Sequence, residues 1–382
     1  MNILMVTAYP PVLHMHGGGV RMYHNIRLLG RKHRVRVISF VENEAERDIL
    51  RTIEPICESV TAVHRIPDFR PHWLSLLPFL VREFSTPDMN SAIDKVFRDT
   101  KVDVLQCEYL QMAQFRRRGV FTILTAHEVL SANAYVAFLR AVDPVEKLKL
   151  YYRWMQILRY EVLAPRKFDR VVTMTESDAS YLRSYSPSTN IRAIPIGVDT
   201  VEFTPFPEEP QRPLDVLFLG NFRHTPNTEA AQFLVERIAP LFPDLRFVLA
   251  GSHVSEHFRV RDNVRFPGYI EETRLLYRRP NTIVVAPLFS GTGQRVKLLE
   301  AFAMQCPVIT SSVGAMGFPI RNGAEALVAD SVEEFANALR RLIESEELRR
   351  ELGSKAREMI AGSFGWDSIG ARLLDLVEEA KR

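Results

Sequence analysis

The chain has few cysteines, no long apolar run and no excess of charge of either sign. Its three cysteines, Cys57, Cys107 and Cys306, are far apart and form no CxxC pair, which argues against a disulfide framework or a zinc site and favours a reducing cytosol. No apolar run reaches the roughly 18 residues that a membrane-spanning helix needs. Basic and acidic residues number 49 and 46, so the composition does not point to a nucleic-acid partner.

A nucleotide-cofactor motif is also missing from the start of the chain. The first apolar run is followed by a loop that ends in three glycines, but the loop does not contain GxGxxG. A dinucleotide site of the dehydrogenase type is therefore disfavoured, and no cofactor is expected. The N-terminal residues MNILMVTAYPP carry no basic segment before their apolar part, so we expect a first strand rather than a signal peptide.

What is present is a long alternation of short apolar strands and amphipathic helices. At 382 residues the chain predicts two domains. The strand Asn2–Thr7, the glycines at 17–19, the helix Val20–Gly30 and the strand Val35–Phe40 form a Rossmann-like unit. Gly18 and Gly19 leave room there for a substrate. Four further strands are predicted in this half, at Val60–His64, Val102–Cys107, Phe121–Ala126 and Arg170–Met174.

His127 directly follows the strand Phe121–Ala126. Ligands of open α/β sheets bind just beyond the carboxyl ends of the strands, so His127 is a candidate for orienting a substrate hydroxyl. The alternative is that His127 has a structural role and only bonds a loop carbonyl at the end of the strand.

Two stretches mix basic and aromatic side chains, Arg65–Phe84 and Lys147–Arg170. Their pattern suits helices that cover a sheet, with arginine stems lying over apolar surface, and we favour this interpretation. Contact with an anionic membrane surface is the alternative.

The second half begins after a proline-rich linker and repeats the α/β pattern. Strands are predicted at Leu214–Leu219, Leu245–Ala250, Thr282–Ala286 and Glu325–Val328, a helix at Thr228–Ile238, and three helices after the last strand, the final one beginning at Trp366. The predicted division is a first domain of residues 1–196, a linker of residues 197–213, a second domain of residues 214–365 and a terminal helix of residues 366–382.

The stretch Phe289–Thr310 (FSGTGQRVKLLEAFAMQCPVIT) predicts a turn, a helix and a strand. A glycine-spaced turn before a helix offers an anion both backbone amides and the positive end of the helix dipole. Lys297 in the first turn can join those amides on a phosphate, and Glu300 can accept hydrogen bonds from sugar hydroxyls. The pattern favours a nucleoside diphosphate site. An ordinary unit of a parallel sheet is the alternative.

Taken together, several segments resemble the retaining glycosyltransferases of family four, which have the GT-B fold, and especially their bacterial exopolysaccharide branch. The matching segments are the opening glycines with LGRKHRVRV at 29–37, His127-Glu128, TESD at 175–178, PIGVD at 195–199, GTG with K and LEAFA at 291–303, and FGWD at 364–367. The resemblance implies two Rossmann-like domains facing a cleft, with the terminal helix crossing back to the first domain.

The resemblance also implies roles for individual residues. Lys297 and Arg295 would contact the diphosphate, Glu300 the ribose, and His127 would position the sugar. The chain departs from the family where the first motif glutamate is replaced by Thr292, and where Asn221 follows Gly220 in place of an arginine; Arg223 and Arg295 are candidate substitutes. The predicted set is His127, Arg295 and Lys297 as catalytic residues, and Gly18, Gly19, Asn221, Arg223, Gly291, Thr292, Gly293 and Glu300 as substrate-binding residues.

The expected activity is sugar transfer from a nucleoside diphosphate sugar to a carbohydrate or lipid-linked acceptor, with retention of configuration. No DxD motif occurs in the sequence, so no essential metal is expected. The rivals are a sugar-nucleotide 2-epimerase and a catalytically inactive sugar-nucleotide-binding or scaffold subunit. We expect a cytoplasmic protein, and contact with the inner face of the cell membrane stays open.

Overall fold

The computed structural model describes residues 1–13, 17–65, 75–207, 213–254, 258, 261–278 and 280–381. The chain divides into two compact units, one of Met1–Pro195 with Ile369–Arg382 and one of Ile196–Ser368. Three predicted features lie partly outside the described residues: the glycine loop (14–16), the first basic and aromatic stretch (66–74, with Trp73) and the linker (208–212).

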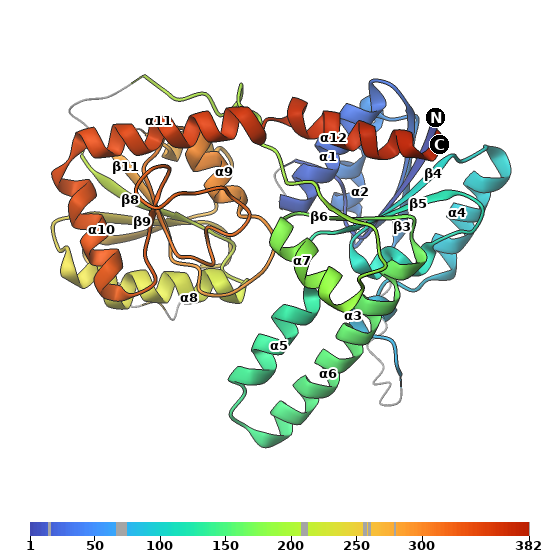
Figure 1. The fold of residues 1–382 in the computed structure, drawn as a ribbon, viewed down its shortest axis with the longest axis horizontal. Helices are drawn as coiled ribbons and strands as arrows, with labels where there is room; N and C mark the ends of the chain where they lie inside the picture. The colour runs from blue at the N-terminus through green and yellow to red at the C-terminus, as the bar shows by residue number, and fades with distance from the viewer. Residues whose placement is uncertain are drawn as a thin grey trace. The chain divides into compact units, whose positions relative to one another are not determined.

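The first unit is built on a parallel sheet (Figure 1). Its described strands follow the order β3-β2-β1-β4-β5-β6-β7. They are β1 (Asn2–Thr7), β2 (Arg34–Val41), β3 (Ser59–His64), β4 (Val104–Glu108), β5 (Phe121–Ala126), β6 (Arg170–Thr173) and β7 (Ile191–Ala193). The central strands β1, β4 and β5 are buried almost throughout, as expected for a parallel sheet covered on both faces. The ends of β4 and β5 are adjacent in register, with Glu108 opposite Thr125. Glu108 and the residues that follow β5, His127 among them, therefore lie at the same edge of the sheet.

The helices of the first unit connect these strands. They are α1 (Gly17–Gly30), α2 (Glu44–Arg51), α3 (Phe79–Arg82), α4 (Pro87–Asp99), α5 (Leu130–Arg140), α6 (Pro144–Leu163) and α7 (Glu176–Tyr185), with short 3₁₀ turns at Glu54–Ile56, Leu110–Phe115 and Pro165–Lys167. The C-terminal helix α12 (Trp366–Glu378) joins this unit from Ile369 on, where Gly370 packs against Leu28 of α1.

The helices α5 and α6 depart from the favoured interpretation of the stretch Lys147–Arg170. They pair with each other as an antiparallel hairpin that extends away from the sheet (Figure 1). Ile157 and Glu161 are the buried residues of α6, so this helix does not cover a sheet along its length. In the described part of the other stretch, Val81 and Phe84 are buried, in agreement with a packed segment.

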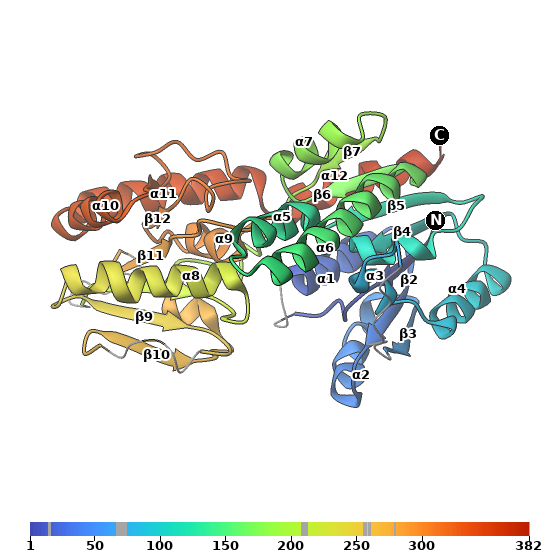
Figure 2. The same cartoon turned by 90° about the horizontal axis from the view of Figure 1, so that it is seen from below.

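The second unit contains a parallel sheet in the order β10-β9-β8-β11-β12-β13 among the described residues (Figure 2). Its strands are β8 (Asp215–Leu219), β9 (Arg246–Ala250), β10 (Val264–Gly268), β11 (Thr282–Ala286), β12 (Val308–Thr310) and β13 (Leu327–Val328). The strand β10 is absent from the sequence-based set. It contains Pro267 and pairs with β9 through an irregular register, so its alternation is weak.

The helices of the second unit lie on both faces of this sheet, with α8 on one side and α9 and α11 on the other (Figure 1). They are α8 (Thr225–Phe233), continued by a π-helical turn (Leu234–Ile238) and a 3₁₀ turn (Ala239–Leu241), then a 3₁₀ turn (Thr273–Leu276), α9 (Val296–Ala303), α10 (Val332–Glu344) and α11 (Glu346–Ser363). The predicted three helices after the last strand are confirmed, and the last begins at Trp366 as predicted.

Candidate active site

The loop between β11 and α9 in the second unit is held in one shape by its own side chains. Gly291 and Gly293 have φ values of 96° and 78°, in the left-handed region that glycine adopts without strain. The Arg295 guanidinium closes the loop because its Nη1 donates to the Thr292 carbonyl at 2.6 Å and its Nη2 to the Gly291 carbonyl at 2.8 Å. Nη1 also donates to the Gly293 carbonyl at 3.0 Å. In the structure this guanidinium therefore bonds loop carbonyls, whereas the sequence pattern aims it at a phosphate.

The helix α9 begins directly after this loop, and no side chain caps its N-terminus. The first amides of a helix have no partner within the helix and, with the helix dipole, favour an anion. Since Arg295 fixes the loop in front of α9, the backbone at this end is preorganised.

Lys297 lies in the first turn of α9 and contacts α8 and β8. Its Nζ donates to Oδ1 of Asn227 at 2.7 Å and lies 4.3 Å from the centre of the Phe218 ring. Burial, and then the positive charge of Arg295, lower the pKa of Lys297 to about 7, against the opposing effect of Glu300. An anion bound beside Lys297 would restore its ordinary charge.

Asn227 is a site residue that the sequence pattern did not reveal. Its Nδ2 donates to the carbonyl of Asn221 at 2.8 Å, so its side chain links the turn after β8 to Lys297. A Cβ on Gly220 would lie 2.9 Å from the Asn227 side chain, which explains glycine at the end of β8. The only sequence signal for Asn227 is its position in the first turn of α8, next to Pro226.

Glu300 lies one turn after Lys297 and is bonded by a tyrosine. The Tyr277 hydroxyl donates to Oε2 of Glu300 at 2.9 Å, and Tyr277 is fully buried. Burial raises the pKa of Glu300 to about 7, although the hydrogen bond from Tyr277 acts to lower it. Tyr277 was not predicted, because it lies in an irregular segment without a motif.

Asn221 and Arg223 form the turn after β8. Oδ1 of Asn221 accepts the backbone N–H of Arg223 at 3.0 Å, so Asn221 shapes the turn. The Arg223 side chain is exposed, and the structure records no bond to its guanidinium within the part of the chain that it describes. Arg223 therefore remains available to an incoming anion.

In the first unit, His127 is bonded to a buried glutamate at the end of the neighbouring strand. Nε2 of His127 donates to Oε2 of Glu108 at 2.7 Å, and 7% of the His127 side chain is exposed against none of Glu108. Burial alone would raise the pKa of Glu108, but the hydrogen bond and charge of His127 and the charge of Arg21 outweigh it, so the pKa is lowered. Glu108 thus fixes the orientation of the imidazole.

Tyr109 follows Glu108 with an unusual backbone. Its φ of 78° is left-handed, which is rare for a bulky residue, and its ring stacks on His127 with centroids 3.9 Å apart and planes 9° apart. A Cβ on Gly18 would lie 1.8 Å from the Tyr109 hydroxyl and 3.2 Å from Nδ1 of His127. Gly18 therefore lets the N-terminus of α1 approach both rings. A Cβ on Gly19 would lie 2.8 Å from the Val12 carbonyl.

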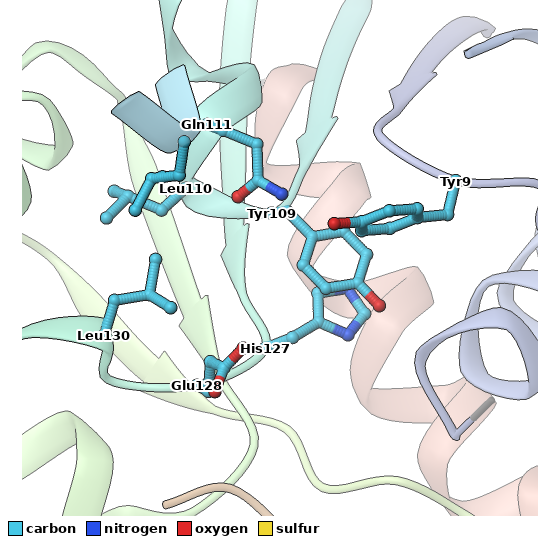
Figure 3. A pocket seen from close by; sticks show the side chains of 8 residues that line it. Tyr9, Tyr109, Leu110, Gln111, His127, Glu128 and Leu130 are labelled. Carbon is cyan, nitrogen blue, oxygen red and sulfur yellow. The ribbon is translucent and has the colours of Figure 1, made fainter. Parts of the chain in front are cut away.

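A pocket of about 140 Å³ opens beside this cluster in the first unit. Figure 3 shows Leu110 and Leu130 on one side of it, with Tyr9, Tyr109, Gln111 and Glu128 around the rest. Within the described residues no group of three or more His, Cys, Asp or Glu side chains could hold a metal ion. No helix of the described chain is long and apolar enough to cross a membrane.

Family models match both units. The model described as Glycosyltransferase Family 4 matches residues 15–202, and the model described as Glycosyl transferases group 1 matches residues 213–345. The chain belongs to these glycosyltransferases. The family predicted from the sequence segments is thus confirmed.

Similarity to known proteins supports this family and the fold. An uncharacterized 44.6 kDa protein in the cps region of Klebsiella pneumoniae is 22% identical over 88% of this chain and 89% of its own. Sucrose-phosphate synthase from Thermosynechococcus elongatus matches with a TM-score of 0.76 and 18% identity over 99% of each chain. HepE of Anabaena, solved with UDP and glucose, matches with a TM-score of 0.72 and 13% identity over 99% of this chain and 100% of its own. These structures confirm the predicted GT-B fold.

The predicted site residues of the glycosyltransferase form two groups. The second unit brings together the loop from Gly291 to Gly293, Arg295, Lys297 and Glu300, and the neighbouring turn with Asn221 and Arg223. The first unit brings together Gly18 and His127, with Gly19 next in α1. Tyr109 and Glu108 complete the first group. Glu108 gives only a weak signal in the sequence, as an acidic residue at the end of an apolar strand.

Proposed function

We propose that this glycosyltransferase moves a sugar from a nucleoside diphosphate sugar to a hydroxyl of a carbohydrate or lipid-linked acceptor, with retention of configuration and without a metal ion. The observation that carries the proposal is the pair Lys297 and Glu300, one turn apart on α9 behind a fixed glycine loop. Their spacing suits a diphosphate next to a ribose. The binding of UDP in the structure of HepE supports this class of donor.

The proposed chemistry places growing negative charge next to α9. As the bond between the sugar carbon and the diphosphate oxygen breaks, the leaving diphosphate gains charge. The acceptor oxygen bonds to that carbon, and its proton passes to an oxygen of the departing diphosphate. The Lys297 ammonium and the N-terminal amides of α9 would stabilise that charge, which accelerates the reaction because the charge is greatest in the transition state. Glu300 would accept hydrogen bonds from the ribose hydroxyls.

In the first unit, His127 would orient a sugar hydroxyl rather than attack the sugar. Glu108 and the stacked Tyr109 ring hold its imidazole in a single orientation, which suits a positioning role. Retention of configuration is inferred from the family resemblance.

Metal independence rests on the chemistry of α9. The sequence contains no DxD motif, and Lys297 with the helix N-terminus supplies positive charge at the diphosphate position. If the proposal is right, transfer continues at an unchanged rate in EDTA. Loss of activity in EDTA that a divalent ion restores would contradict it.

The reaction class can be tested with a panel of nucleotide sugars. The protein is incubated with each donor and a mixture of carbohydrate acceptors, and free nucleoside diphosphate and glycosylated product are measured. Release of diphosphate that depends on the acceptor supports transfer. Interconversion of sugar nucleotides would indicate an epimerase, and binding without turnover would indicate a scaffold subunit.

We also propose that the hairpin of α5 and α6 rests on an anionic membrane surface. Its tip exposes apolar side chains: Val142 is 94% exposed, Leu148 69%, Val145 62% and Leu139 53%. The hairpin carries five basic and three acidic residues, and the acid Glu161 is buried, so its surface is positively charged. Exposed apolar and basic groups together suit anionic lipid, and the positive surface disfavours a second copy of the same hairpin.

The membrane contact is tested by flotation with vesicles. We expect binding to phosphatidylglycerol vesicles, and little to phosphatidylcholine vesicles. The double variant Val142→Asp with Leu148→Asp should lose binding, whereas Val201→Asp, at an apolar residue 82% exposed in the second unit, should keep it. Equal flotation of both variants would refute the contact.

A further inference from the structure

The pocket in the first unit has features that restrict the chemistry of its occupant. We propose that it takes a neutral, hydroxyl-bearing sugar ring of the acceptor and rejects anionic groups such as a phosphate or a uronic acid. The inference rests on the proposed sugar transfer and specifies its acceptor. It follows from the size, the polar groups and the charge of the pocket.

The size of the pocket matches a small ring. Its volume is about 140 Å³, well below the roughly 300–1,000 Å³ of sites that enclose drug-sized ligands. A nucleoside diphosphate would not fit within it, whereas a single monosaccharide ring is of the right order. The pocket is therefore suited to the acceptor rather than to the donor.

The lining of the pocket combines apolar surface with polar groups that suit hydroxyls. Figure 3 shows Leu110 and Leu130 facing the ring of Tyr109 across the pocket, with the amide of Gln111 and the carboxylate of Glu128 at its two ends. An amide offers both donors and acceptors, and a carboxylate accepts, so both suit hydroxyl groups. The leucines and the aromatic ring suit the apolar face of a sugar ring.

The charge around the pocket is negative. Glu128 lines it, none of the described lining residues is a lysine or an arginine, and the lining residue His127 is already paired with Glu108. The Tyr9 hydroxyl, which also borders the pocket, feels one positive charge, that of Arg65, and three negative charges, those of Glu83, Glu128 and Glu42.

The described cations near the pocket are already bonded. His127 is paired with Glu108, and the guanidinium of Arg21, whose charge acts on Tyr109, donates to the carbonyls of Ile194 and Pro195. Arg65 forms an ion pair with Glu42 and another with Glu83, the latter at 3.6 Å. An anion in the pocket would lie beside Glu128 without an unpaired cation from the described lining. Such an anion loses its hydration without gaining a partner, and this excludes it.

The inference is tested by saturation-transfer NMR and titration on the full chain, using methyl glucoside, methyl galactoside and methyl mannoside as neutral probes. Each is compared with the 6-phosphate of the same sugar. We expect at least one neutral glycoside to bind in the millimolar range, and its phosphate to bind at least tenfold more weakly. Equal or tighter binding of the phosphates, or no binding of any neutral glycoside, would overturn the proposal.

Two variants locate the binding. Gln111→Ala should weaken the neutral glycoside at least threefold, and Glu128→Gln should narrow the gap between glycoside and phosphate by threefold or more. Glu44→Gln removes an exposed carboxylate of α2 and should leave both affinities unchanged. Thermal unfolding shows whether each variant is folded. If the difference in affinity between glycoside and phosphate narrowed in Glu44→Gln and not in Glu128→Gln, the role of Glu128 would be refuted.

The same experiments separate this inference from the proposed function. Transfer by the protein to phosphorylated acceptors only would overturn the neutral pocket and leave the transferase proposal intact. If glycosides bound in a way that depends on Gln111 but no sugar was transferred from any nucleotide sugar, the neutral pocket would stand and the transferase proposal would be overturned.

Discussion

Lys297 has the most distinctive environment of the residues on α9. Burial and the adjacent Arg295 lower its pKa to about 7, while Asn227 accepts a hydrogen bond from it. A lysine with this pKa is largely neutral at pH 8.5. A bound diphosphate favours the charged form, so binding should be coupled to uptake of a proton.

Calorimetry can measure this coupling at pH 8.5, where UDP is fully ionised because phosphate groups lose their last proton near pH 6 and where Glu300, with a pKa of about 7, is already charged. In buffers of different ionisation enthalpy, binding of UDP should take up about one proton. Lys297→Arg should bind UDP with almost no uptake, since arginine is always charged. Equal uptake by the wild type and this variant would contradict the assignment.

Tyr277 should affect the ribose end of the donor only. Tyr277→Phe removes the hydrogen bond to Glu300, which leaves the buried carboxylate less well oriented. A loss of about 1 kcal/mol, or roughly fivefold in affinity, is expected for UDP. Pyrophosphate, which has no ribose, should bind Tyr277→Phe and the wild type equally.

A matched control for that variant is Tyr269→Phe, at a tyrosine that is 61% exposed. It should leave both affinities unchanged. If Tyr277→Phe lost as much affinity for pyrophosphate as for UDP, relative to the wild type, the tyrosine would support the loop rather than the ribose site.

Sequence patterns were sufficient for residues on one element and insufficient for contacts between elements. Lys297 and Glu300 could be predicted together because they are three residues apart on one helix. Their partners Asn227 and Tyr277 lie 70 and 23 residues away in the chain. Only the packing of α8, and of the segment after the 3₁₀ turn Thr273–Leu276, against α9 brings them close. The loop-closing role of Arg295 was hidden for the same reason, since a guanidinium near a glycine turn suits either a phosphate or a carbonyl.

At the scale of elements, the start of α5 depends on a residue of α6. No side chain of its own caps α5, and the carboxylate of Glu161 accepts the N–H of Leu130 at 2.9 Å and that of Ser131 at 3.2 Å. Because α5 follows His127-Glu128 after one residue, this contact also anchors the segment that carries the histidine.

Removing that carboxylate should destabilise the first unit. Glu161→Ala leaves buried amides without an acceptor, and we expect the free energy of unfolding to fall by about 1–3 kcal/mol. Arg159→Ala, at an exposed position of the same helix, is the control and should change it by less than about 0.5 kcal/mol. Urea unfolding measures both. A Glu161→Ala protein as stable as the control would show that the cap contributes nothing.

Helices and strands could be predicted where the spacing of apolar residues was regular. The elements against which they pack could not be predicted. The stretch Lys147–Arg170 was predicted to be helical, and α6 covers its first part, as far as Leu163. Basic and aromatic residues on a helix suit a sheet, a membrane or a partner helix equally. The structure pairs α6 with α5 and leaves the tip exposed. The strand β10 was missed because Pro267 interrupts a short segment.

At the scale of the whole molecule, the order of segments carried most of the prediction. The repeated strand-and-helix pattern predicted two parallel-sheet units, and the ordered motifs predicted the family, which the family models confirm. The pocket of the first unit could not be predicted, since it depends on Tyr9, Leu110 and Glu128 from three different segments meeting in space.

The central claim of the account is that Lys297, at the start of α9, stabilises the leaving diphosphate during sugar transfer. The most direct test is the turnover rate for diphosphate release from the donor identified in the panel, measured in EDTA with saturating acceptor. Lys297→Ala should be slower than the wild type by about a hundredfold or more, since losing one such group costs roughly 3–4 kcal/mol. Lys355→Ala, at a half-buried lysine of α11 that pairs with Glu351, should match the wild type. A folded Lys297→Ala protein whose turnover stays within about threefold of the wild type would contradict the account.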